Sequence, residues 1–327
     1  MSNRAWRLRF SDGLYRHFST QHVDGPSNAE IDAAFRHMDG VPDVEGVECF
    51  SRTTVTLENA AHVKRRLDER GLVCAMVSHG ETVARGFPKA LWTSPEAADR
   101  REAIEMALYS IEVARALDAR GVYLFTALDG PDYPFQQDFR RARRFTVEAL
   151  REICDAAGDL LVALEYRIHT PKGWSNIGSM AATLDLAKEV GRPNLGAQLE
   201  VAHTLLSHEN LGQAAWDAAR VGRLHHLHLN DTQLPIDIGT IFASHHFWEC
   251  LELLYWLREA DYQGFLGIDC FWWQVDSALN AAQQVHNIHF MLRVLDALDD
   301  ASFREAMGDQ DILATQEMLW EALRRAR

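Results

Sequence analysis

The chain has 327 residues, of which 47% are hydrophobic and 24% are charged, and its formal net charge is −14. These proportions are ordinary for a folded globular protein, and a single α/β barrel domain commonly reaches this length. Because the net charge is strongly negative, we expect no nucleic acid partner.

The sequence also indicates in which cellular compartment the protein is expected. No stretch approaches the ~18 apolar residues that a membrane span requires, and the first residues, MSNRAWRLRFSDG, lack the apolar core of a signal peptide. We therefore expect a cytoplasmic protein with no membrane partner. The five cysteines are an odd number without CxxC spacing, which is typical of reduced thiols in a protein core.

Short apolar stretches alternate along the chain with segments of helical periodicity. We predict strands at residues 6–10, 46–50, 72–78, 122–126, 160–166, 195–200, 224–229 and 265–270. We predict helices at residues 27–38, 57–70, 94–118, 135–156, 180–190, 211–220, 246–260, 276–298 and 301–325. Residues 79–93 are too long and irregular for a simple turn and are expected to form a functional loop.

Eight strands, each followed by a helix, are typical of a (β/α)8 TIM barrel. A doubly wound open sheet is the alternative. We disfavour it because neither G-x-G-x-x-G nor G-x-x-x-x-G-K-[ST] follows a predicted strand. We expect residues 1–298 to form the catalytic barrel and residues 299–327 an additional C-terminal helical extension, which caps the barrel or contacts another subunit.

Four consecutive predicted strands end in a possible metal ligand: Glu165, Glu200, His228 and Asp269. The carboxyl ends of barrel strands meet at one face, and neighbouring strands lie ~4.8 Å apart, so these side chains can converge. Any one of them alone is more often a solvated strand end or a core residue. Three carboxylates buried together would be costly without a cation. Together with an imidazole they suit a divalent ion such as Mn²⁺, Mg²⁺ or Co²⁺ better than thiolate-seeking Zn²⁺.

A second ion could lie on the outer side of Glu200. His203 follows this acid by three residues, and Asp237 follows the seventh predicted strand. Like the first group, they offer imidazole nitrogen and carboxylate oxygen as ligand atoms. Asp231 is a possible substitute for Asp237.

Several segments resemble the xylose isomerase-like TIM barrels, and within them the metal-dependent sugar isomerases, especially the bacterial L-rhamnose isomerases. The ligand segments that carry the likeness are LEYRIHTP, LEVAH, HLHLND and GIDCFWW. The segments LFTALDGPDYPFQQDF and GFPKALWTSPEAADRREA are similar to loops after the fourth and third strands of these enzymes. The likeness covers roughly residues 70–290.

The resemblance implies roles for individual residues. A structural ion would be held by Glu165, Glu200, His228 and Asp269. A second, catalytic ion would be held by Glu200, His203 and Asp237. Arg167 stands where these isomerases usually have Lys and would polarise a substrate oxygen. The expected catalytic set is therefore Glu165, Arg167, Glu200, His203 and Asp269. We expect His79 and Trp273 to join Arg167 in binding the substrate.

The resemblance also implies a reaction: interconversion of an aldose and a ketose through a metal-assisted hydride shift between C1 and C2. The expected ion is Mn²⁺, with Mg²⁺ or Co²⁺ as alternatives, and the expected partner is a small-molecule sugar. A homo-oligomer, either a dimer or a tetramer, is implied as well. The alternative enzymes are a keto-sugar 3-epimerase, a dehydratase and a hydroxypyruvate isomerase, and a non-enzymatic barrel with a degenerate metal site is a further possibility.

Besides Arg167 in place of Lys, the chain departs from the isomerase pattern at two further points. QLPIDIG offers only Asp237 where these enzymes commonly have a D-x-D pair, and ECFSR has no His at the end of the second strand. Two other residues favour the isomerase over the 3-epimerase. The related epimerases have a longer Glu where this chain has Asp269, and an Arg where it has Leu234.

Overall fold

The computed structural model describes residues 6–18, 22, 24–79, 91–169, 171–270 and 274–326. Residues 80–90 of the predicted functional loop, and Trp273, therefore lie outside the described residues. The barrel strands are β1 (Phe10–Gly13), β2 (Val44–Ser51), β3 (Val73–His79), β4 (Gly121–Phe125), β5 (Leu161–Glu165), β6 (Leu195–Glu200), β7 (Leu224–Leu229) and β10 (Leu266–Ile268).

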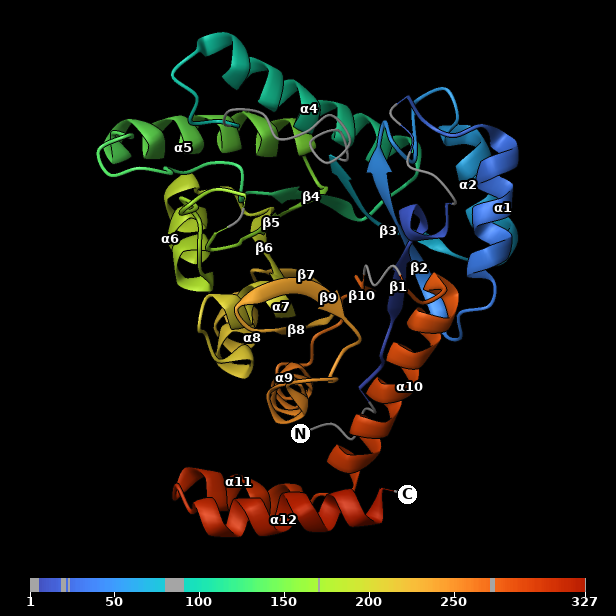
Figure 1. The fold of residues 1–327 in the computed structure, drawn as a ribbon, viewed down its shortest axis with the longest axis vertical. Coiled ribbons are helices and arrows are strands. Elements are labelled where there is room, and N and C mark those ends of the chain that lie inside the picture. Colours follow the sequence, from blue (N-terminus) through green and yellow to red (C-terminus); the bar gives the residue numbers. More distant parts are fainter. Residues whose placement is uncertain are drawn as a thin grey trace.

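These eight strands form a closed parallel barrel in the order β1, β10, β7, β6, β5, β4, β3 and β2 (Figure 1). Strands that follow one another in sequence are therefore neighbours around the whole ring. The predicted (β/α)8 barrel is confirmed, and the open sheet is excluded. Between β7 and β10 lies an antiparallel hairpin that the sequence did not predict, formed by β8 (Asp231–Gln233) and β9 (Ile236–Thr240).

Helices alternate with the strands, and all of the described helices except the last two lie around the barrel (Figure 1). They are η1 (Leu14–His17), α1 (Asn28–Met38), α2 (Ala60–Arg70), α4 (Ala97–Ala116), α5 (Phe139–Ala157), α6 (Met180–Val190), α7 (Val201–Leu206), α8 (Leu211–Ala219), α9 (Phe247–Glu259), α10 (Ser277–Asp296), α11 (Asp300–Gly308) and α12 (Ile312–Arg325). Among the described residues, no helix combines the length and the apolar character needed to cross a membrane.

Local capping chemistry explains several helix boundaries. Ser27 and Glu30 form a capping box at the start of α1, in which each side chain accepts a hydrogen bond from the other residue's backbone N–H. Helices α2 and α6 end at Gly71 and Gly191, which adopt left-handed φ angles of 65° and 71°. Glycine adopts this conformation without steric cost. The ends of these helices could therefore be predicted from the sequence.

The first strand lies further along the chain than the predicted range of residues 6–10. Strand β1 begins at Phe10, opposite Leu266 of β10. The preceding segment lies outside the barrel ladder, and the indole of Trp6 donates a hydrogen bond to the backbone carbonyl of Tyr262. The alternating pattern of residues 6–10 thus reflects packing beneath the barrel. The shift places Ser11 inside the strand, where it reaches the barrel lumen.

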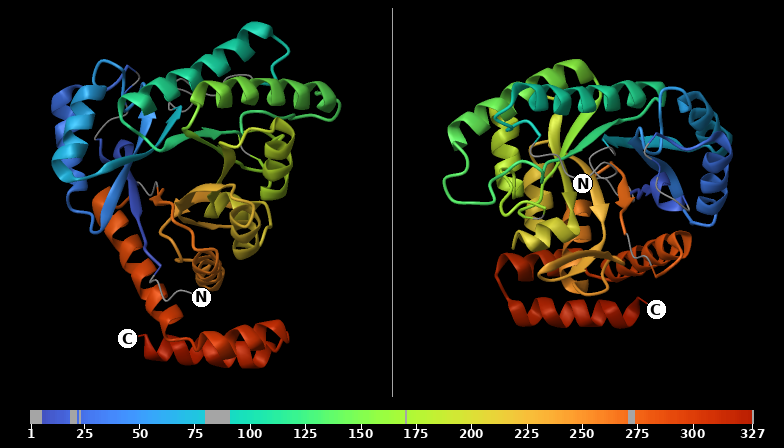
Figure 2. Two further views of the ribbon diagram at one scale, coloured as in Figure 1. Left: turned by 180° about the vertical axis from the view of Figure 1, so that it is seen from behind. Right: turned by 45° about the horizontal axis from the view of Figure 1, so that its top comes forward.

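The C-terminal extension contains two helices where one continuous helix is predicted. Helix α11 ends at Gly308, Gln310 adopts a positive φ of 56°, and the side chain of Asp311 caps α12. Both helices lie beyond the ring of barrel helices in each view (Figure 2). The rings of Trp248 on α9 and Trp320 on α12 meet edge to face at 5.1 Å and tie the extension to the barrel.

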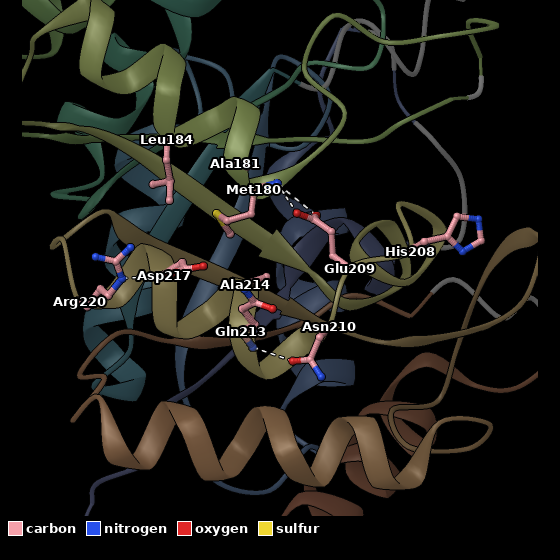
Figure 3. Close-up of a pocket in the computed structure, with 10 residues that line it drawn as sticks. All are labelled: Met180, Ala181, Leu184, His208, Glu209, Asn210, Gln213, Ala214, Asp217 and Arg220. Atoms are coloured by element: carbon pink, nitrogen blue, oxygen red, sulfur yellow. Dashed lines mark hydrogen bonds and ion pairs between the residues drawn. The ribbon is translucent and has the colours of Figure 1, made fainter. Parts of the chain in front are cut away.

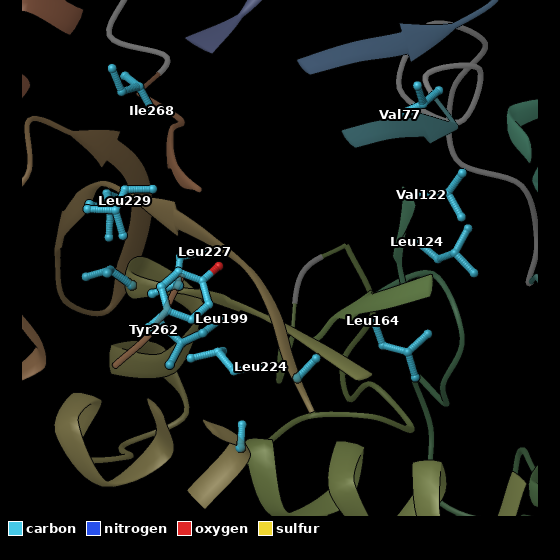
Figure 4. Packing of buried hydrophobic residues seen from close by; sticks show 14 of the residues in the cluster. Val77, Val122, Leu124, Leu164, Leu199, Leu224, Leu227, Leu229, Tyr262 and Ile268 are labelled. Atoms are coloured by element: carbon cyan, nitrogen blue, oxygen red, sulfur yellow. The ribbon is translucent and has the colours of Figure 1, made fainter. Parts of the chain in front are cut away.

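The two faces of each barrel strand have different environments. Residues that face the helices, such as Leu124, Leu164 and Leu227, are buried in the main apolar core (Figure 4). Side chains alternate along a strand, so the intervening residues face the lumen. Glu48 of β2 and His226 of β7 are hydrogen-bonded although their strands are not neighbours, which means that they meet across the lumen. The barrel interior therefore holds polar side chains beneath the strand ends that carry the predicted ligands.

A buried histidine on the helix-facing side of β7 makes the stability of the fold depend on pH. Burial of His225, together with the positive charge of Arg223, lowers the pKa of its imidazole to about 4. An unfolded chain has a histidine pKa of ~6.5, so the unfolded state takes up this proton first as the pH falls. The stability contributed by neutral His225 is therefore complete above pH ~6.5 and is lost progressively between pH ~6.5 and ~4.

We expect His225→Gln to reduce the loss of stability between pH 7 and pH 5. Between pH 7 and pH 5, the lowered pKa of His225 reduces the unfolding free energy of the wild type by ~2 kcal/mol. Gln does not titrate, so the variant would not show this part of the loss. Urea unfolding of the wild type and the variant at both pH values measures the difference. Equal losses in the two proteins would be inconsistent with a buried, neutral His225.

Candidate metal centre

The predicted ligands lie together at the carboxyl ends of four strands. Glu165 and Glu200 are the last residues of β5 and β6, His228 is the penultimate residue of β7, and Asp269 directly follows β10. All four side chains are buried. Glu200 lies opposite His228 in the ladder between β6 and β7, so these two residues are at the same height in the barrel.

Three of these side chains form a compact group. Ligand atoms of Glu165, Glu200 and His228 all lie within 4.8 Å of one another. Asp269 adjoins the group, because its Oδ2 is 3.4 Å from His228 Nδ1, and Glu200 Oε2 is 3.7 Å from the same nitrogen. We call these four residues the inner cluster. Nδ1 is the nitrogen of His228 that faces the carboxylates of Glu200 and Asp269.

A second group shares Glu200 with the inner cluster. His203 Nδ1 is 3.2 Å from Glu200 Oε2, and His203 Nε2 is 3.2 Å from Asp237 Oδ2. The short helix α7 begins directly after β6 and brings His203 back over the acid three residues before it. Asp237 comes from the unpredicted hairpin, on β9. Glu200, His203 and Asp237 have ligand atoms within 4.8 Å of one another, and we call them the outer cluster.

The remaining predicted site residues lie at different distances from these clusters. Arg167 adjoins the outer cluster, with Nη1 3.1 Å from Asp237 Oδ2. His79 is buried at the end of β3, and burial lowers its pKa to about 4. Val77, two residues earlier on the same strand, belongs to the helix-side core. Strand alternation therefore turns His79 away from the lumen, and it joins neither cluster.

Asp231, the possible substitute for Asp237, has a different task in the structure. Its carboxylate accepts hydrogen bonds from the backbone N–H groups of Thr232, His245 and His246, at 2.7 to 2.9 Å, and from the His246 ring. These donors fix the segment that precedes α9. With its oxygens engaged in this way, Asp231 is not part of the outer cluster.

Further residues, which the sequence did not predict, support the clusters from below and from the side. Glu48 accepts hydrogen bonds from Ser11, His226 and His228. Asn230 Nδ2 donates to Glu200 Oε1 at 2.9 Å, and the Tyr15 hydroxyl donates to Asp269 Oδ1 at 2.9 Å. Glu48 stands within the otherwise apolar stretch GVECF. A charged side chain in the middle of a buried barrel strand is the signal that would have identified it.

The sequence model of the xylose isomerase-like TIM barrel family matches residues 38–293. The chain belongs to this family. The xylose isomerase of Thermus thermophilus is 26% identical over 209 residues, which cover 62% of this chain and 54% of that protein. The chain therefore spans about half the length of this curated relative.

Two solved structures illustrate the likeness in three dimensions. A D-tagatose 3-epimerase-like protein has a TM-score of 0.69 and 15% identity, covering 88% of this chain and 98% of its own. The 3-keto-D-glucoside 4-epimerase of E. coli has a TM-score of 0.64 and 16% identity, and the match covers 86% of this chain and 99% of the epimerase. At this level of identity, the likeness shows a shared fold alone.

Within this family barrel, the buried acids carry unequal charge. Burial and the negative charge of Glu200 raise the pKa of Glu165 well above its ordinary value. Burial opposes ionisation of Glu200 as well, but His203 and His228 outweigh it and hold its pKa below the ordinary value. For His228, burial is outweighed by Asp269 and Glu48, so its pKa is raised. Of the two glutamates, Glu200, which both clusters share, is therefore the one whose ionised form is favoured.

The residues of both clusters fit a divalent ion. Their donor atoms are carboxylate oxygens and imidazole nitrogens, a set that suits Mn²⁺, Mg²⁺ or Co²⁺. Within the described part of the chain, the buried Nδ1 of His203 has no hydrogen-bond partner, although it lies 3.2 Å from Glu200 Oε2. Buried carboxylates without a cation are costly, and a divalent ion would remove that cost and occupy the free nitrogen.

A separate pocket of about 410 Å³ lies over helices α6 and α8 (Figure 3). Four of its polar side chains are engaged with the backbone or with each other. Glu209 accepts hydrogen bonds from the N–H of Met180, Asn210 caps α8, and Asp217 pairs with Arg220. It contains no residue of the inner or outer cluster. We therefore place the candidate site at the clusters and not in this pocket.

Proposed function

We propose that the chain is a divalent-metal-dependent sugar isomerase that interconverts an aldose and a ketose. The observation that carries this proposal is the shared acid: Glu200 lies in both clusters, so two ions could be held side by side. A pair of ions is suited to a substrate with two adjacent oxygens. In this proposal, residues 1–298 form the catalytic barrel and residues 299–327 form the helical extension.

The clusters define which residues would hold the ions. The inner ion would be held by Glu165, Glu200, His228 and Asp269. The outer ion would be held by Glu200, His203 and Asp237. Bound divalent ions, for which we propose Mn²⁺, would act as Lewis acids that polarise O1 and O2 of an open-chain sugar. In the reaction, hydrogen leaves C2 with its electron pair and joins C1, while the proton of O2 passes to O1.

Two other side chains have roles that follow from their contacts. Arg167 lies beside Asp237 at the rim of the outer cluster, where its guanidinium could donate to a sugar oxygen. Asp269 is engaged at both oxygens, because Tyr15 donates to Oδ1 and His228 Nδ1 lies near Oδ2. An acid held in this way is a poor choice for a mobile general base. This supports a hydride shift over proton abstraction by Asp269.

One observation favours a second candidate, the epimerisation of a ketose at C3 with a single ion. Asp237 Oδ2 is already 3.1 Å from Arg167 Nη1 and 3.2 Å from His203 Nε2. The cationic guanidinium therefore competes with an outer ion for the same oxygen. If Arg167 keeps this contact, the inner cluster alone would hold an ion.

NMR of sugar interconversion tests the proposal. Metal-stripped protein is incubated in D2O with a panel of aldoses and ketoses, with and without added Mn²⁺. We expect Mn²⁺-dependent exchange between an aldose and its ketose, without deuterium entering C1 or C2. Inversion at C3 of a ketose, with deuterium at that carbon, would support the second candidate. Absence of turnover on every sugar, with Mn²⁺ bound, would contradict both.

A further inference from the structure

Glu48 lies in the middle of β2, fully enclosed beneath the inner cluster. Only 1% of its surface is exposed. Its Oε1 accepts hydrogen bonds from Ser11 Oγ at 2.7 Å and His226 Nε2 at 3.0 Å, and its Oε2 accepts one from His228 Nε2 at 2.8 Å. Three donors therefore surround one carboxylate, which favours its ionised form, a form that can only accept hydrogen bonds.

The two nitrogens of His228 face different carboxylates, and the amide nitrogen of Gln198 lies 3.1 Å from Nδ1 and 3.4 Å from Nε2. Nε2 is directed at Glu48, whereas Nδ1 lies 3.4 Å from Asp269 Oδ2 and 3.7 Å from Glu200 Oε2. An imidazole that binds a metal keeps one N–H, and its partner determines which nitrogen carries that hydrogen. We propose that Glu48 is a positioning residue, which holds the hydrogen of His228 on Nε2 and so directs the Nδ1 lone pair to the inner ion. This inference rests on the metal centre proposed above.

The surroundings of His228 restrict its ring to this orientation. Tyr123 and His226 meet the ring edge to face, at centroid distances of 5.1 and 5.5 Å. A Cβ atom on Gly267 would lie 2.4 Å from Glu48 Oε1 and 2.9 Å from His228 Cδ2. The absence of a side chain at this position is what allows the carboxylate and the imidazole to meet. The interior is therefore shaped around this hydrogen bond.

A different arrangement would place an ion among Glu48, His226 and His228 themselves, since their ligand atoms also lie within 4.8 Å of one another. The contacts favour hydrogen bonds instead. The separations of 2.8 and 3.0 Å between nitrogen and oxygen are ordinary hydrogen-bond lengths, and Ser11 donates to the same carboxylate. An ion at that place would take His228 Nε2, whereas our proposal uses Nδ1. The nitrogen that binds the ion distinguishes the two arrangements.

The first test needs no variant. Wild-type protein labelled with ¹⁵N-histidine is loaded with ¹¹³Cd²⁺, and the coupling between cadmium and the His228 nitrogens is measured. We expect coupling to Nδ1 and a retained hydrogen on Nε2. Coupling to Nε2 would overturn the proposal.

The second test compares two substitutions on the same hydrogen-bond group by titration calorimetry with Mn²⁺ alone. Glu48→Gln keeps the shape of the side chain but replaces one acceptor oxygen by a donor, so Mn²⁺ affinity should fall ~10- to 100-fold. Ser11→Ala removes one donor and leaves the carboxylate in place. It should change the affinity far less than Glu48→Gln does.

The outcomes separate this inference from the proposed function. If the wild type binds no Mn²⁺, the proposed metal centre fails and the role of Glu48 fails with it. If the wild type binds Mn²⁺ and Glu48→Gln binds it equally well, the positioning role alone is wrong. An equal loss in Ser11→Ala and Glu48→Gln would likewise overturn it, because general loosening of the interior would then explain both. Should Glu48→Gln not fold, the cadmium coupling in the wild type still decides.

Discussion

Substituting Glu200 by Gln is expected to abolish turnover on every sugar and to remove both ions. The variant loses the one negative charge that the inner and outer clusters share. A Lewis acid contributes several kcal/mol to such a reaction, so we expect a loss on the order of 1,000-fold or more in kcat/KM. Metal content after dialysis and the NMR assay measure the two effects.

Glu209→Gln provides a matched control for this substitution. Glu209 is a half-buried glutamate that accepts hydrogen bonds from the N–H of Met180, and it lies outside both clusters. We expect this variant to keep its ions and its activity. Near-normal turnover by Glu200→Gln, or equal losses in the two variants, would refute the shared-acid arrangement.

Gly267→Ala is expected to cause a large loss of stability for the addition of a single methyl group. The new Cβ would lie 2.4 Å from Glu48 Oε1, 2.7 Å from the Leu227 carbonyl oxygen and 2.9 Å from His228 Cδ2. The carbonyl belongs to the neighbouring strand β7 and cannot move without disturbing the barrel ladder. Overpacking of this kind costs ~3 kcal/mol of unfolding free energy. Urea unfolding of metal-free protein measures it.

Gly308→Ala makes the same chemical change at an open position. Gly308 is the last residue of α11, and a Cβ there meets no atom within 4 Å in the described structure. Helical Ala is favoured over Gly by ~0.5–1 kcal/mol, so this variant should be unchanged or slightly more stable. Similar stability of the two variants would show that the interior around Gly267 accommodates a methyl group without strain.

The convergence of the four candidate ligands could be predicted because it depends on local pattern. Glu165, Glu200, His228 and Asp269 each end or follow a short apolar stretch, and a parallel barrel brings such ends to one face. The outer cluster was harder to derive. Asp237 reaches it because residues 231–240 form a hairpin, and no strand is predicted from the sequence between the seventh and eighth barrel strands.

The supporting residues depend on contacts that local pattern does not contain. Glu48 and His228 are 180 positions apart in the chain and meet across the lumen only when the barrel has closed. His79 shows the same dependence from the other side. Its place at a strand end suggests a substrate ligand, but the alternation of β3 places it on the helix side, where it is buried. The roles of Glu48 and His79 both depend on whether the side chain points into the lumen or toward the helices.

The most direct test of the metal centre is anomalous X-ray scattering at the manganese edge from crystals grown with Mn²⁺. Two peaks are predicted. One should lie among Glu165, Glu200, His228 Nδ1 and Asp269, and the other among Glu200, His203 and Asp237, with Arg167 displaced from Asp237. A single peak in the inner cluster would remove the paired-ion argument for the isomerase and leave the single-ion epimerase as the better account. If crystals grown in saturating Mn²⁺ show no manganese peak at either cluster, the metal centre itself is contradicted.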